Sequence, residues 1–199
     1  MRIALAALAL TACGNASRPA PPYDLSLHAE CGALQSANGV AISTVHLRLV
    51  GVTAVSDRAS ADGRAQVAEI DLSPGGAVDQ DLPSAPPGLY SAVQLALGDA
   101  ANAGVDVQAV WNGEPLHATV FGGPFDVACP TAAPLQLGRR AHLALHADPA
   151  AWFGGVDLAS ATTDSDDVGL LLSNDDNAPQ AQQLLINVVA SLKLDCSAD

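Results

Sequence analysis

Two acidic loops carry the side chains of this chain that are best suited to chemistry. They are Thr163-Asp164-Ser165-Asp166-Asp167 and Ser173-Asn174-Asp175-Asp176-Asn177, on either side of the apolar segment Val168 to Leu172. Such oxygen ligands suit Ca²⁺. The candidate ligands of such a calcium site are Asp164, Asp166, Asp167, Asp175 and Asp176. The loops do not fit an EF-hand, and solvent-exposed turns with Asx caps explain the same residues without a metal.

The histidines are weaker candidates for a metal site. His142 and His146 share one face of a strand-like segment, but four residues of strand separate them by about 13 Å. That separation is too large for one metal ion to bind both rings. His28 and Glu30 also share a face and can chelate weakly, although alternation along any strand produces such pairs often. We expect these side chains to be surface residues without a metal.

Three cysteines, Cys31, Cys129 and Cys196, remain besides Cys13. None has the close spacing of a zinc or redox site. In an oxidising compartment we expect two of the three to form a structural disulfide and one to stay free. Three pairings are open, and Cys31 with Cys129 is favoured because each of these residues ends a strand-like segment.

The motifs of common enzymes are absent from the sequence. There is no Gly-x-Ser-x-Gly elbow, no His-Glu-x-x-His helix, no phosphate-binding glycine loop and no Cys-x-x-Cys pair. These motifs place the nucleophile, metal ligand or backbone amide on which hydrolysis, nucleotide binding or thiol exchange depends. Trp111 and Trp152 can stack on a sugar or an apolar ligand, although packing is the more common role. We expect a protein that is not an enzyme.

The first fifteen residues, MRIALAALALTACGN, predict how the chain is held at a membrane. Arg2 precedes a short apolar run that closes in Leu10-Thr11-Ala12-Cys13, the layout of a bacterial lipobox. We expect a lipoprotein signal peptide over residues 1–12, removed before Cys13, and lipid on Cys13 as the membrane anchor. A chance cysteine behind an ordinary secretory signal is the alternative.

Residues 13–22 follow as the lipidated cysteine and a small, polar, proline-rich tether. Gly14 stands where Asp would retain many Gram-negative lipoproteins at the inner membrane, so we expect attachment to the outer membrane, facing the periplasm or the cell surface. The chain has eight basic and 21 acidic residues and a net charge of −13. This balance argues against nucleic acid as a partner, and against docking on anionic lipid through a basic face. Neutral or cationic partners fit better.

Residues 23–199 have the size of a single domain, with strands first and helices last. Segments of strand-like pattern recur between turn signals at Leu25–Cys31, Val40–Val55, Ala65–Leu72, Leu89–Leu97, Val105–Trp111, Pro115–Phe121 and Leu135–His146. This spacing is typical of an all-β sandwich. Asp62-Gly63 and Asn112-Gly113 each predict a hairpin turn.

Two helical segments are expected after these strands. Asp148-Pro149 is a capping pair that predicts a short helix. Asn177 and Pro179 predict a second helix, whose apolar residues recur at helical spacing and cover a sheet edge or an open end of the sandwich. The expected fold is mainly β, an antiparallel β-sandwich with one or two short C-terminal helices.

Several phrases of the sequence resemble a known group of proteins. They are VHLRLVGVTAVS (Val45–Ser56), EIDL (Glu69–Leu72), LPSAPPGLYSAVQLALG (Leu82–Gly98) and WFGGVDL (Trp152–Leu158). This set is similar to uncharacterised bacterial lipoproteins that carry a transthyretin-like, or prealbumin-like, β-sandwich domain behind a lipobox. The resemblance covers about residues 23–147. It implies a secreted binding or scaffolding module and brings no catalytic residue.

Two functions from different classes are therefore expected. The first is a non-enzymatic, membrane-tethered lipoprotein that binds or scaffolds a protein or glycan of the cell envelope and needs no cofactor. The alternative is a calcium- or metal-binding envelope lipoprotein that uses the acidic loops or the histidines.

Overall fold

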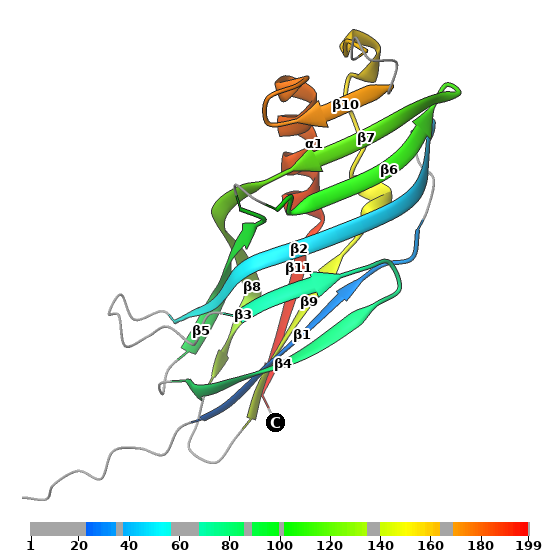
Figure 1. Ribbon diagram of the computed structural model, residues 1–199. Helices are drawn as coiled ribbons and strands as arrows, with labels where there is room; N and C mark the ends of the chain where they lie inside the picture. Colours follow the sequence, from blue (N-terminus) through cyan, green and yellow to red (C-terminus); the bar gives the residue numbers. More distant parts are fainter. Residues whose placement is uncertain are drawn as a thin grey trace, which may run out of the picture.

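The computed structural model describes residues 23–34, 38–56, 68–85, 89–99, 102–134, 140–163 and 169–198. They form two β-sheets that enclose one hydrophobic core (Figure 1). One sheet has four strands in the order β11-β9-β1-β4, and the other has seven. The predicted mainly-β sandwich is confirmed. None of the helices in the described part of the chain is long and apolar enough to cross a membrane.

The elements have the following bounds. The four-stranded sheet contains β1 (Tyr23–Cys31), β4 (Ala77–Ala85), β9 (Arg140–Ala147) and β11 (Lys193–Ala198). The seven-stranded sheet contains β2 (Val40–Ser56), β3 (Ala68–Leu72), β5 (Leu89–Leu97), β6 (Val105–Trp111), β7 (Glu114–Val120), β8 (Gly122–Pro134) and β10 (Leu170–Ser173). The helical elements are α1 (Ala178–Ser191) and two 3₁₀ turns, η2 (Pro149–Ala151) and η3 (Leu158–Ser160).

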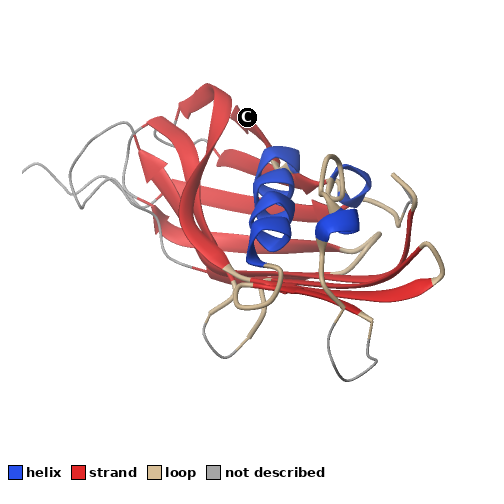
Figure 2. Ribbon diagram, turned by 90° about the horizontal axis from the view of Figure 1, so that it is seen from above, coloured by secondary structure: helices blue, strands red, loops and turns tan. Residues whose placement is uncertain are grey.

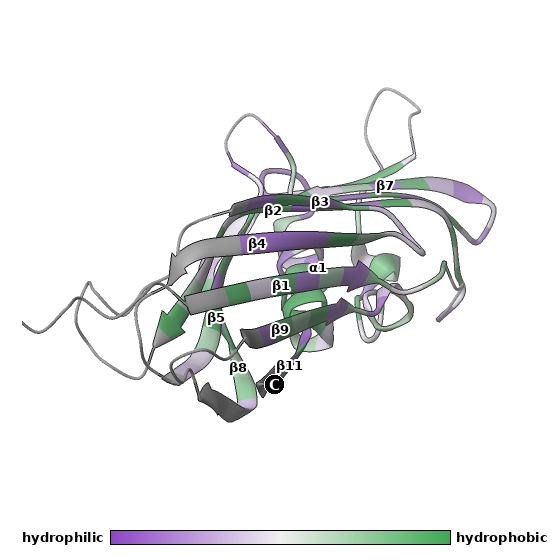
Figure 3. Ribbon diagram, turned by 90° about the horizontal axis from the view of Figure 1, so that it is seen from below, coloured by the Kyte–Doolittle hydropathy of each residue, from purple (hydrophilic) through white to green (hydrophobic). Residues whose placement is uncertain are grey.

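The strands of the smaller sheet are buried on one face only. Leu27 and Ala29 of β1 and Leu143 and Leu145 of β9 are at most 1 % exposed, while the residues between them reach solvent. This alternation follows from the period of two in a strand, and it confirms the predicted half-buried strand AHLALHA. The hydrophilic stretches of β4, β1 and β9 accordingly lie side by side in Figure 3.

The larger sheet is built from long strands that bend together. β2 pairs with β6 along its first half and with β5 along its second half, both on the edge opposite to β3. On the next edge outward, β7 pairs with β6 and β8 pairs with β5. The register of β2 with β5 and of β5 with β8 shifts at the same level, near Leu97. Because bulges bend a strand and increase its twist, the sheet curls here and brings β8 against β11 (Figures 1 and 2).

α1 lies between the two sheets and contacts β7 and β10 on one side and β9 on the other (Figure 2). Its buried residues Ala181, Leu184 and Val188 recur every three or four positions, as an amphipathic helix requires. The helix begins after Asn177 and has Pro179 in its first turn, so the predicted start is confirmed. Asn177 itself makes no side-chain capping bond.

The hairpin at Asn112-Gly113 is confirmed. β6 and β7 pair antiparallel with Trp111 opposite Glu114, and Asn112 and Gly113 have φ of 52° and 87°. Positive φ at both central residues is what a type I′ turn demands. The Asp62-Gly63 turn lies outside the described residues, although β2 and β3, on either side of it, do pair antiparallel.

Two strand pairs depart from the expected antiparallel arrangement. β1 pairs with β9 in parallel, and β10 pairs with β7 in parallel. Parallel strands are joined by long crossover connections rather than by tight turns, so no turn motif in the sequence predicts their pairing. The order of strands first and helices last is also wrong, since β11 follows α1.

The favoured pairing of Cys31 with Cys129 is wrong, because the disulfide joins Cys129 of β8 to Cys196 of β11. The last residues form a strand that the sequence did not predict, and this strand brings Cys196 against the larger sheet. Cys31 is a buried free thiol at the end of β1. The expected count of one disulfide and one free thiol among these three residues is confirmed.

Candidate functional site

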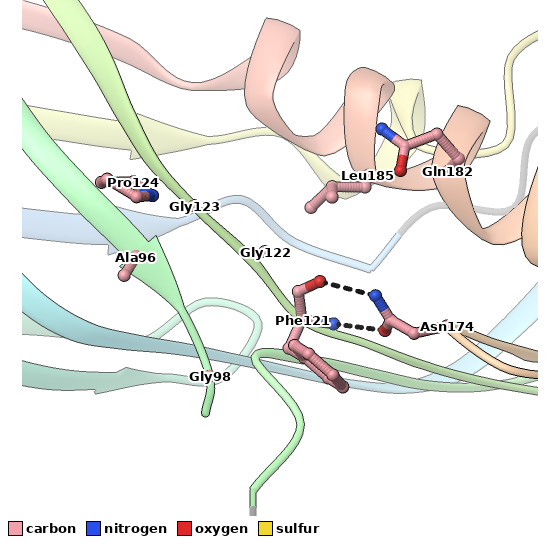
Figure 4. Close-up of a pocket in the computed structure, with 9 residues that line it drawn as sticks. All are labelled: Ala96, Gly98, Phe121, Gly122, Gly123, Pro124, Asn174, Gln182 and Leu185. Carbon is pink, nitrogen blue, oxygen red and sulfur yellow. Dashed lines mark hydrogen bonds between the residues drawn. The ribbon is translucent and has the colours of Figure 1, made fainter. Parts of the chain in front are cut away.

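An open groove of about 530 Å³ lies where the larger sheet bends and α1 crosses it (Figure 4). At the bend, the groove is lined by the end of β5 and the start of β8, and two side chains of α1 also line it. Nine residues line the groove: Ala96, Gly98, Phe121, Gly122, Gly123, Pro124, Asn174, Gln182 and Leu185. Its volume falls in the range of sites that hold small molecules or short segments of a larger ligand.

The floor of the groove depends on a glycine. A Cβ atom at Gly122 would lie 2.5 Å from Cδ2 of Leu185, so the missing side chain lets α1 pack closely on β8. Gly123 follows and is joined to Pro124 by a cis peptide bond. Gly123 and Pro124 are exposed, and the side chain of Leu185 points toward this stretch in Figure 4.

Asn174 fixes one wall of the groove. Its Oδ1 accepts a hydrogen bond from the backbone N–H of Phe121 at 3.0 Å, and its Nδ2 donates to the carbonyl of Phe121 at 3.0 Å. The pairing of β10 with β7 ends at Ser173. The carboxamide of Asn174 then makes the two hydrogen bonds to Phe121 that a peptide group of a neighbouring strand would otherwise make. The side chain of Phe121 stays 40 % exposed beside it.

The chemistry of the groove is neutral. Phe121, Pro124, Leu185 and Ala96 supply apolar surface, and the exposed amide of Gln182 on α1 supplies a hydrogen-bonding group at the rim. None of the nine lining residues is charged, although the chain as a whole carries a net charge of −13. The groove is therefore suited to a ligand with an apolar face and uncharged polar groups.

The acidic loops are described only in part. Asp164, Asp166 and Asp167 lie outside the described residues. Asp175 and Asp176 belong to a turn organised by Ser173, whose hydroxyl accepts from both of their backbone N–H groups at 3.2 and 2.8 Å. Within the described ranges, no group of three His, Cys, Asp or Glu side chains is arranged to hold a metal ion. A calcium site therefore stays a prediction.

The histidines lie on the outer faces of the two sheets, each beside a partner that the sequence did not indicate. His142 Nδ1 is 2.6 Å from Ser26 Oγ, and His146 Nδ1 is 2.5 Å from Glu30 Oε1. The parallel register of β1 and β9 places these residues directly opposite each other. His28 lies 3.5 Å from Glu30, the same-face pair predicted above, and 2.7 Å from Asp79 of β4.

No pattern in the sequence led us to expect the groove. Its glycines and Pro124 resemble an ordinary turn, and the carboxamide of Asn174 was counted as part of an acidic loop. The one available signal was the Phe-Gly-Gly-Pro run at residues 121–124, because adjacent glycines within a strand pattern mark a bulge or a close backbone approach.

Of the remaining predicted residues, Cys13 precedes the described part of the chain, and Trp111 and Trp152 do not line the groove. Trp152 is fully buried and packs in the core. No family model, curated protein or solved structure matches this chain.

Proposed function

We propose that this chain is a non-enzymatic binding module of the bacterial cell envelope, anchored through lipid on Cys13. The groove at the bend of the larger sheet is its ligand site. The observation that carries this proposal is the uncharged lining of the groove, which combines exposed glycine backbone, the Phe121 ring and the Gln182 amide. The resemblance to lipoproteins with a transthyretin-like domain supports the same function.

The ligand proposed for the groove is uncharged and extended, such as a loop of an envelope protein or a neutral glycan. Apolar surface with a few placed polar groups is the usual composition of such sites. The net charge of −13 disfavours anionic ligands, since it repels them over a distance of several ångströms.

The groove is tested by backbone NMR titration with two defined probes, a neutral N-acetylated oligosaccharide and an uncharged proline-containing peptide. We expect one probe to shift the amides of Ala96, Gly98, Gly122 and Gly123. Gln182→Trp, which places a large ring at the rim, is expected to abolish these shifts. Ala190→Trp is the matched control, because this position is also exposed on α1 but does not line the groove.

Two results would contradict the groove as the ligand site. One is that neither probe at millimolar concentration perturbs the four amides, and the other is that both tryptophan variants bind a probe as the unaltered protein does.

The lipid anchor is tested separately. Cys13→Ser removes the thiol that lipid transfer requires, so we expect the variant to leave the membrane fraction or to stall in processing. Lipid on the N-terminal fragment of Cys13→Ser would contradict the proposed anchor.

A further inference from the structure

A row of alternating carboxylates and imidazoles crosses the outer face of the four-stranded sheet. It runs from Asp79 on β4 through His28 and Glu30 on β1 to His146 on β9 and Asp195 on β11. His28 has Nδ1 at 2.7 Å from Asp79 Oδ1 and Nε2 at 3.5 Å from Glu30 Oε2. His146 has Nδ1 at 2.5 Å from Glu30 Oε1 and Nε2 at 3.6 Å from Asp195 Oδ2. Each imidazole thus lies between two carboxylates.

This arrangement distinguishes the two protonation states of the rings. A neutral imidazole has one N–H and one nitrogen lone pair, so between two carboxylates it donates to one and turns its lone pair toward the other. An imidazolium has two N–H groups and can donate to both. Protonation of His28 and His146 therefore converts a partly repulsive row into a continuous alternation of negative and positive charge.

The surrounding groups leave an excess of negative charge on this face. Besides the five residues of the row, the described outward-facing titratable side chains are Asp81 on β4, His142 on β9 and Lys193 on β11. His142 is engaged by Ser26, and Lys193 lies opposite His146 in the register. Four carboxylates thus face one lysine while the histidines are neutral, and this excess of negative charge favours proton uptake by His28.

We propose that the row is a proton-operated clasp, in which protonated His28 and His146 tie the edge strands β4 and β11 to the central strands β1 and β9. His28 joins β4 to β1 through Asp79, and His146 joins β9 both to β1 through Glu30 and to β11 through Asp195. Both edges of the smaller sheet are therefore held more firmly in mildly acidic solution than at alkaline pH.

The direction of the pH effect follows from two groups. The hydrogen bond with Asp79 raises the pKa of His28 above its ordinary value of 6.5. Its contribution to stability is thus present below about pH 6.5 and is lost as pH rises through the folded-state pKa. The hydrogen bond with His146 lowers the pKa of Glu30 below its ordinary value of 4.5, so this contribution is lost only as pH falls through the lowered value. The clasp is strongest between about pH 4.5 and 6.5.

Urea unfolding at pH 5.5 and pH 8.0 tests the clasp with two double variants. The first is His28→Gln with His146→Gln. The control is His46→Gln with His117→Gln, since His46 and His117 are similarly exposed on the larger sheet but each faces one carboxylate, Asp71 or Asp106, at 3.0 Å. We expect the unaltered protein and the control to have a higher urea midpoint at pH 5.5, and the first variant to lose most of that difference. Equal pH dependence in the two double variants would overturn the proposal.

A second measurement does not depend on those variants. The ring carbons of His28 are followed by NMR as the pH of the unaltered protein and of Asp79→Asn is changed. We expect the titration midpoint of His28 to lie above 6.5 and to fall in Asp79→Asn, which keeps the shape of the side chain but removes its charge. A midpoint below 6.5, or one that Asp79→Asn leaves unchanged, would overturn the clasp.

Discussion

Cys196, in the last strand of the chain, is bonded to Cys129 in β8, so the disulfide joins the four-stranded sheet to the seven-stranded one. β8 and β11 belong to different sheets and contact each other. The bond therefore fixes the distance between the two layers on this side of the core. It also holds β11, a short edge strand that pairs only with β9 among the described strands.

Breaking this bond is expected to destabilise the fold strongly. The two cysteines are 67 residues apart, and closing a loop of that length restricts the unfolded chain by about 4 kcal/mol. We expect Cys129→Ala with Cys196→Ala to lower the free energy of unfolding by about this amount in urea titrations. Reductant is expected to affect the unaltered protein in the same way and to leave the double variant unchanged. A reductant effect in the double variant would assign the stabilisation to another bond.

The free thiol of Cys31 is expected to be unreactive in the folded protein. Burial, and to a smaller extent the charge of Asp148, raises its pKa to about 11 from an ordinary value of 9.0. Because thiolate is the reactive form, alkylation at pH 8 should require unfolding. Without reductant, the unfolded chain should then expose one reactive thiol among Cys31, Cys129 and Cys196. Two or more reactive thiols at these positions would contradict the disulfide.

The same pKa predicts a loss of stability in alkaline solution. A raised pKa means that the folded state holds its proton after the unfolded state has lost it, so the contribution of Cys31 is present below about pH 9 and declines as pH approaches 11. Cys31→Ala is expected to flatten the decline in urea midpoint between pH 9 and 11. Tyr90 remains in both proteins, so its raised pKa of about 12 does not affect the comparison. If the urea midpoint of Cys31→Ala declined as steeply as that of the unaltered protein, the raised pKa of Cys31 would be contradicted.

The sequence predicts the strands better than it predicts their partners. The period of two in β1 and β9 identifies which face is buried, because that pattern depends on each strand alone. The row from Asp79 to Asp195 depends on the register of four strands from distant parts of the chain, and no local pattern carries that information. β4 was missed for a different reason. Its Asp79, Asp81 and Pro83 suit an edge strand, and such residues also resemble a loop.

At Asn177, too, the local role of the residue was predicted from the sequence but its contacts with distant segments were not. Its place before Pro179 predicts a helix start, which the structure confirms. Its side chain instead links Thr162 to β10, accepting from the backbone N–H of Thr162 and donating to the carbonyls of Thr162 and Leu171. A helix start is a local event, whereas these bonds depend on how segments fifteen residues apart meet in the folded chain.

Gly98 is expected to tolerate no side chain. It has a φ of +63°, and a Cβ atom there would lie 2.2 Å from the backbone nitrogen of Gly104, where β5 turns toward β6. Gly75 is the matched control, since it has a φ of +70° but nothing within 4 Å of the same position. We expect Gly75→Ala to cost about 1 to 2 kcal/mol from backbone strain alone. Gly98→Ala should cost clearly more, because the backbone of residues 102–104, just before β6, must move.

Denaturant titrations of the two alanine variants measure this difference. Gly98 also lines the proposed groove, so Gly98→Ala should disturb the amides of Gly122 and Gly123 while Gly75→Ala leaves them unchanged. Equal destabilisation by the two substitutions would show that β5 and β6 do not approach each other as closely as the structure has them.

The indole N–H of Trp152 is expected to contribute to the stability of the fold through its hydrogen bond to α1. The ring is fully buried, and its Nε1 donates to Ser191 Oγ at 3.0 Å, while that hydroxyl donates to the carbonyl of Val188 at 2.7 Å. Ser191→Ala leaves a buried N–H without its acceptor and should lower the free energy of unfolding by about 1 to 3 kcal/mol. Trp152→Phe removes the N–H as well but opens a void, which should cost about 2 to 4 kcal/mol.

A double-mutant cycle separates the hydrogen bond from the packing. In the Trp152→Phe background, Ser191→Ala should cost less than it does in the unaltered protein, because the N–H that it would leave without an acceptor is already absent. Trp111→Phe with Ser191→Ala is the control pair, and its two effects should simply add, since Trp111 is the last residue of β6 and Ser191 is bonded to Trp152 and Val188 instead. Additive effects for Trp152 and Ser191 would mean that the hydrogen bond between these two side chains does not contribute to the stability of the fold.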